Sequence, residues 1–197
     1  MRLVPPVCHA YNMAELVARL ATPVTEDDHV QGPLDAEVTL LQYGDYECPY
    51  TRMSRQSIHA LQREFPEKLR FVFRHFPLEE IHAHARGAAT AAEAAEAQGQ
   101  FWPMHEYLFE HQTALKDRDL RQYAMDLGLK LDRFEQDRTS PDVGSRIDRD
   151  LASGELSGVQ GTPTFYVNGV RHDGTFDVDV LRAAITRAMP GEARGNR

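Results

Sequence analysis

The change from a strand pattern to a helix pattern at residue 48 most constrains the fold. Residues 38–43 form a short apolar run typical of a buried strand, and residues 48–64 follow with the spacing of an amphipathic helix. Pro49 suits the first turn of that helix, and Pro66 cannot continue it. The side chains expected to turn inward are Met53, Ile58, Leu61 and Phe65. Residues 69–76 predict a second strand, so this part should be strand–helix–strand.

A long helical block comes next. Residues 78–156 carry helical periodicity with few β-branched residues, and breaks fall near Gly99, Gly128 and Ser140. We therefore divide the chain into an N-terminal extension (1–34), a first part of the domain (35–77), a helical insertion (78–156), a second part of the domain (157–190) and a flexible tail (191–197).

Strand patterns return after the helical block. Residues 164–167 and 170–172 read as two strands joined by Asn168-Gly169, the signal of a type I' hairpin turn, and a last helix is expected over 178–188. The predicted fold class is α/β, with a mixed β-sheet and a large all-helical insertion. If all these strands share one sheet, Pro163 should lie close to Cys48.

The composition narrows the classes of partner and location. A formal net charge of -8 argues against a nucleic-acid or anionic-membrane surface. Cys8 and Cys48 are the only cysteines, too few for a disulfide framework. No apolar run approaches the roughly 20 residues that cross a bilayer, and the first residues lack the apolar segment of a secretory signal. We expect a cytoplasmic protein with neither membrane nor nucleic acid as partner.

The tetrapeptide Cys48-Pro49-Tyr50-Thr51 at the start of the helix is a candidate redox motif. A C-x-x-C pair in this place indicates thiol-disulfide chemistry, but here the hydroxyl of Thr51 replaces the second sulfur. The positive end of the helix dipole favours the thiolate of Cys48, and the hydroxyls of Tyr50 and Thr51 are candidate hydrogen-bond donors to its sulfur. Cys48 is expected to attack a disulfide without being able to form one with residue 51.

A mixed disulfide on Cys48 must be resolved by another thiol. The candidates are glutathione or a related small thiol, a second protein, and Cys8. We therefore predict a thiol-disulfide oxidoreductase that works as a monothiol enzyme, with Cys48 and Thr51 as its catalytic residues. Its partners would be protein or small-molecule thiols and disulfides, with glutathione as a candidate co-substrate and no bound cofactor.

Several segments resemble the DsbA-like branch of the thioredoxin-fold superfamily. They are residues 28–33, 43–50, 71–77, 99–105, 128–129 and 158–165, in an order and spacing similar to the family's. The resemblance implies a thioredoxin-like fold in which Thr162-Pro163 is a cis-proline loop that faces Cys48 and orients substrate. Pro49 and Tyr50 are expected to contact substrate as well. Thr51 departs from the family, because most relatives have the resolving cysteine there.

Two other functions stay open. Related thioredoxin folds with similar insertions include glutathione-dependent transferases and an isomerase, which need no resolving cysteine. Loss of one cysteine is also what a non-catalytic binding module would show. No metal site is predicted, because the spacing of the candidate histidines does not support zinc. These histidines are His75, His82, His84, His105 and His111.

Overall fold

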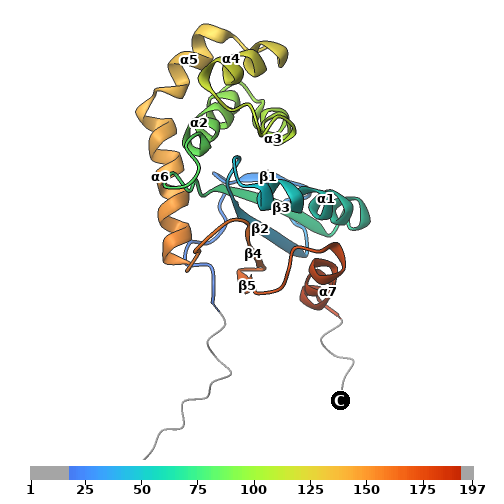
Figure 1. Cartoon of the computed structure of the whole chain (residues 1–197). Helices are drawn as coiled ribbons and strands as arrows, with labels where there is room; N and C mark the ends of the chain where they lie inside the picture. Colours follow the sequence, from blue (N-terminus) through green and yellow to red (C-terminus); the bar gives the residue numbers. More distant parts are fainter. Residues whose placement is uncertain (1–17, 192–197) are drawn as a thin grey trace, which may run out of the picture.

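The computed structural model describes residues 18–191, so Cys8 and all but the first residue of the predicted tail lie outside the described part of the chain. In chain order its elements are β1 (His29–Gln31), β2 (Val38–Gly44), α1 (Pro49–Glu64), β3 (Leu69–His75), α2 (Ala85–Glu96), α3 (Phe101–Glu110), α4 (Asp117–Asp126), α5 (Leu131–Arg138), α6 (Pro141–Leu156), β4 (Thr164–Val167), β5 (Val170–His172) and α7 (Val178–Ala188). Along the chain, the helices α2–α6 lie between β3 and β4, as predicted, and Figure 1 shows them above and beside the sheet.

The strands form one mixed sheet in the order β1-β3-β2-β4-β5. β2 and β3 are parallel and connected through α1, whereas the other neighbouring strands are antiparallel. Asn168 and Gly169 both have positive φ, 48° and 76°, and link β4 directly to β5. These values confirm the predicted type I' turn. The predicted fold class, a mixed sheet with a helical insertion, is confirmed.

The strand β1 was not predicted, because residues 1–34 were expected to be an extension of the domain. β1 pairs antiparallel with β3, with His29 opposite Phe73. Asp28, just before it, forms a buried ion pair with Arg74 of β3, at 2.7 Å between Oδ1 and Nε. The backbone of Arg19 also forms an isolated antiparallel β-bridge with Val170 of β5. Residues 19–31 are therefore attached to both edges of the sheet.

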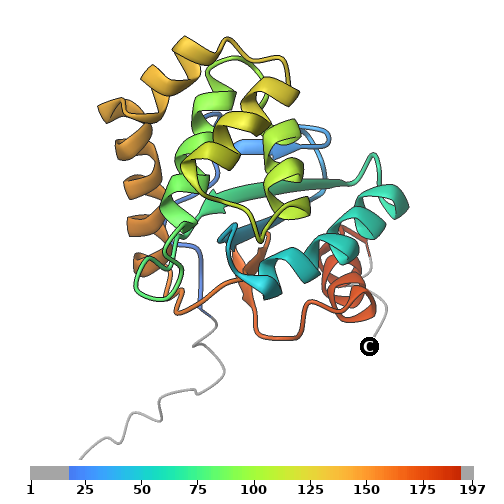
Figure 2. The same ribbon diagram turned by 45° about the horizontal axis from the view of Figure 1, so that its top comes forward.

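Helices cover both faces of this sheet. On one face, Leu40 of β2 belongs to a cluster with Ile58 of α1 and Leu181 of α7, and this cluster continues into the helical block. On the other face, Tyr43 belongs to a second cluster, against which Leu151 of α6 packs. Figure 1 shows α1 and α7 together on one side of the sheet and α6 on the other. Figure 2 shows α2–α5 stacked as a block above the sheet.

The buried face of α1 corrects one prediction. Its buried positions are Thr51, Ser54, Ile58 and Leu61, which repeat at three- and four-residue intervals. Met53 lies off this stripe and is 58% exposed, although it was expected to turn inward. The prediction for Met53 was wrong because it relied on apolar character alone. The first buried positions of this helix are filled by small polar side chains instead.

Candidate active site

The turn between β2 and α1 places Cys48 at the N-terminus of the helix. Cys48 is the N-cap: its backbone is extended, its carbonyl accepts a hydrogen bond from Arg52 N at 3.2 Å, and Pro49 begins the helix. Only 4% of Cys48 is exposed. The cysteine therefore occupies the positive end of the helix dipole, where the sequence placed it.

A loop 114 positions further along the chain faces this cysteine. The Thr162-Pro163 peptide bond is cis, as expected from the resemblance, and the Cys48 thiol donates a hydrogen bond to the Thr162 carbonyl, at 3.1 Å from Sγ to O. Thr164, at the start of β4, is the antiparallel partner of Tyr43 near the end of β2. The pairing of these two strands brings the cysteine and the proline loop together.

The hydroxyls of Thr51 and Tyr50 do not face the sulfur. Thr51 is fully buried, and its Oγ1 accepts a long hydrogen bond from the Asp45 amide, at 3.5 Å. Tyr50 is 60% exposed. Within residues 18–191, neither hydroxyl donates to Cys48, so the hydrogen bonds expected from the sequence are not formed. The reason is the direction of α1, which buries position 51 beneath the turn and leaves position 50 in solvent.

Two acidic side chains next to the cysteine hold the loop that follows β3. The buried carboxylate of Asp45 accepts hydrogen bonds from the amides of Glu47 and Leu78, at 2.7 and 2.9 Å. His82 Nδ1 lies 2.8 Å from the same carboxylate. Glu47 turns toward His84, whose amide donates to it at 2.6 Å. These pairs were not predicted from the sequence, because single contacts between distant segments leave no periodic signal.

A buried phenol–imidazole pair ties the same turn to the helical block. The hydroxyl of Tyr46 lies 3.0 Å from Nδ1 of His105 in α3. Burial raises the pKa of Tyr46 well above its usual value and lowers the pKa of His105 well below its usual value. Both groups are therefore uncharged near neutral pH, so the pair positions the turn without adding charge near the cysteine.

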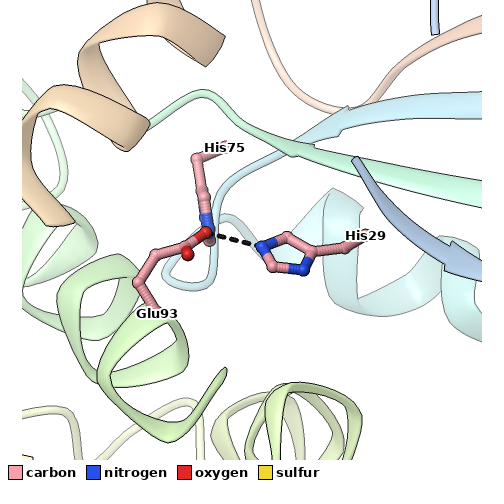
Figure 3. Close-up of side chains that lie close together, drawn as sticks. All are labelled: His29, His75 and Glu93. Carbon is pink, nitrogen blue, oxygen red and sulfur yellow. Dashed lines mark hydrogen bonds and ion pairs between the residues drawn. The ribbon is translucent and has the colours of Figure 1, made fainter. Parts of the chain in front are cut away.

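A second buried polar cluster, made of His29, His75 and Glu93, joins β1, β3 and α2 (Figure 3). Nε2 of His29 and Nε2 of His75 lie 2.6 and 2.8 Å from the same oxygen, Oε1 of Glu93. Burial alone would raise the pKa of Glu93, but the hydrogen bonds from both imidazoles reverse this and hold it well below its usual range. The cluster is therefore an ionised carboxylate held by two imidazoles.

These three side chains are also a donor set that zinc accepts, and their ligand atoms lie within 4.8 Å of one another. His75 was among the candidate histidines of the sequence, but His29 and Glu93 were not, because they come from elements far apart in the chain. Nε of Arg146 lies 3.9 Å from the same Glu93 oxygen, so a second cation there would meet its positive charge. Hydrogen bonds satisfy the Nε2 atoms of His29 and His75, whereas Nδ1 of His75 is buried without a partner within residues 18–191. The absence of a metal stays a prediction.

Comparison with known sequences identifies relatives over most of the chain. A family model described as Thioredoxin matches residues 24–187. The Na⁺/H⁺ antiporter NhaA 1 of Salinispora arenicola is 44% identical over 180 residues, which are 91% of this chain and 28% of that protein. The NhaA antiporter of Herminiimonas arsenicoxydans is 42% identical over 179 residues, with 90% and 28% covered. This chain therefore spans 28% of the length of these two relatives.

Solved structures with a similar fold include a thioredoxin-like oxidoreductase and the protein BdbD. A thioredoxin-like oxidoreductase from Silicibacter pomeroyi has a TM-score of 0.76 and 27% identity, over 83% of this chain and 93% of the other. Oxidised BdbD from Bacillus subtilis has a TM-score of 0.76 and 25% identity, over 87% and 98%. Each similarity therefore extends over most of this chain and of the solved structure.

Proposed function

This chain belongs to the thioredoxin family, and we propose that it is a DsbA-like thiol-disulfide oxidoreductase that works as a monothiol enzyme through Cys48. One observation carries the proposal: the sulfur at the N-terminus of α1 lies 3.1 Å from the carbonyl that precedes cis-Pro163. A helix N-terminus supports thiolate chemistry, and the half-buried loop backbone beside it supports alignment of an extended substrate.

The proposed cycle consists of two thiol-disulfide exchanges. The Cys48 thiolate attacks one sulfur of a substrate disulfide, the bond between the substrate sulfurs breaks, and the released thiolate takes a proton from solvent. A second thiolate, from glutathione or a protein, then attacks the mixed disulfide and releases Cys48. One disulfide and one thiol enter, and one disulfide and one thiol leave, so the electrons balance.

The remaining site residues receive roles in this cycle. Thr51 prevents an internal disulfide at position 51, so an external thiol must complete the reaction. Once Cys48 is ionised it no longer donates to the Thr162 carbonyl, which is then available to a substrate strand beside Pro163. Pro49 and the exposed ring of Tyr50 border the same site and would contact the substrate. We place this cycle in the cytoplasm, because the chain has only two cysteines and small thiols stay reduced there.

The test is turnover of a glutathionylated peptide in the presence of reduced glutathione. We expect the wild-type chain and Cys8→Ser to catalyse release of the peptide thiol and Cys48→Ser to lose catalysis. A wild-type chain without turnover, or a Cys48→Ser variant with unchanged turnover, would contradict the proposal. Peptide binding without turnover would indicate a non-catalytic module, and conjugation of glutathione to an electrophile would indicate a transferase.

Ion transport, which the names of the curated relatives describe, is not part of this proposal. The match covers 28% of those proteins, so most of their length has no counterpart in this chain. Across residues 18–191, the helices are too short or too polar to cross a membrane. We infer that the shared part is a thioredoxin-type module and that antiport depends on the unmatched part of the relatives.

A further inference from the structure

We propose that Gln112 is a positioning residue for Cys48. Gln112 follows α3 in the helical block and is half-buried. Its side-chain amide donates to the carbonyl of Tyr46 at 2.7 Å and to the carbonyl of Cys48 at 2.9 Å. One side chain from the insertion thus binds the backbone of the nucleophile itself. The functional meaning of this inference rests on the proposed thiol exchange.

The two contacts fix how the amide is oriented. Both partners are carbonyl oxygens, which accept hydrogen bonds only, so the NH₂ group of Gln112 must face the turn. The Cys48 carbonyl also accepts the first hydrogen bond of α1, from Arg52 N at 3.2 Å. Gln112 therefore acts on the peptide unit that begins the helix, and its N–H dipoles add positive potential beside the cysteine.

The turn at residues 45–48 is held by hydrogen bonds from two sides, and Gln112 contributes to one of them. The acidic side chains of Asp45 and Glu47 bind the loop after β3 on one side. On the other side, the helical block contributes Gln112 and the contact of His105 with Tyr46. The insertion thereby fixes the position of Cys48 at the start of α1, although it supplies no reacting atom.

Alkylation of Cys48 across a pH series tests the proposal, in a Cys8→Ser background so that one thiol reacts. Gln112→Leu keeps a similar size and loses both donors, whereas Gln112→Lys keeps donors at a similar reach. Gln98→Leu is the matched control. Gln98 is also half-buried and binds the backbone of Lys130, the N-cap of α5, at 2.9 Å from N to Oε1 and 3.3 Å from Nε2 to O.

We expect Gln112→Leu to lower the alkylation rate at pH 7 by about two- to tenfold and to move the rate profile toward higher pH. Gln112→Lys should move the profile back to the wild-type position or to lower pH, because it keeps donors and its ammonium adds positive charge beside the sulfur. Gln98→Leu should leave the wild-type profile unchanged, even if it lowers the thermal midpoint as much as Gln112→Leu does. A Gln112→Leu profile that matches wild type, or a Gln112→Lys profile that stays at the higher pH of Gln112→Leu, would overturn the proposal. Because alkylation needs no turnover, an inactive wild-type chain would contradict the proposed function and leave this result standing.

Discussion

At the scale of single residues, Thr51 decides which disulfides the site can form. Replacing Thr51 by Cys in a Cys8→Ser chain restores two thiols one helical turn apart, at the start of α1. With oxidised glutathione as the oxidant, we expect this variant to lose both free thiols and to form an internal disulfide. Cys8→Ser alone should accept one glutathione on Cys48. A thiol titration and intact mass separate these products. A variant that carries glutathione and keeps one free thiol would contradict the expectation.

Gly44 is a second residue on which the turn depends, because no side chain fits there. A Cβ at this position would lie 2.4 Å from the ring of Phe73 and 2.9 Å from the methyl of Thr51. We expect Gly44→Ala to lower the free energy of unfolding by about 1–3 kcal/mol, measured by urea denaturation. Gly87→Ala is the control, since its nearest contact is 3.9 Å from Leu120. Equal stability of both variants would refute the packing argument.

At the scale of elements, Glu93 joins α2 to β1 and β3 through His29 and His75. Its pKa in the folded chain lies below the ordinary value of 4.5, so the unfolded chain binds more protons in that range. The stabilisation is therefore present above about pH 4.5 and is lost as the pH falls toward the folded pKa. We expect Glu93→Gln to lower the free energy of unfolding by about 2 kcal/mol at pH 7.

The same variant gives the control for acid sensitivity. The difference in unfolding free energy between wild type and Glu93→Gln should shrink as the pH falls below 4.5, because the wild type alone loses the carboxylate contribution. Urea denaturation at a series of pH values measures it. A difference that stays constant from pH 7 to pH 3 would show that the ionised carboxylate does not hold these elements together.

At the scale of the whole molecule, local patterns predicted most of the fold. The strands β2 and β3 and the helices arise from spacings within a few residues, which sequence analysis detects. The strand β1 is too short to show alternation and is defined by its pairing with β3. At the site, Cys48 and Pro163 were predicted from motifs. The contacts of Asp45 and Gln112 were not, because each joins one side chain to a distant backbone.

The central claim is that Cys48 exchanges disulfides and that an external thiol resolves its mixed disulfide. The most direct measurement is incubation of the wild-type chain with oxidised glutathione, followed by intact mass and peptide mapping, with Cys48→Ser as control. We predict one glutathione on the Cys48 peptide, removed when reduced glutathione is added. A Cys48 that stays a free thiol, or that forms a disulfide with Cys8 in place of the adduct, would contradict the account.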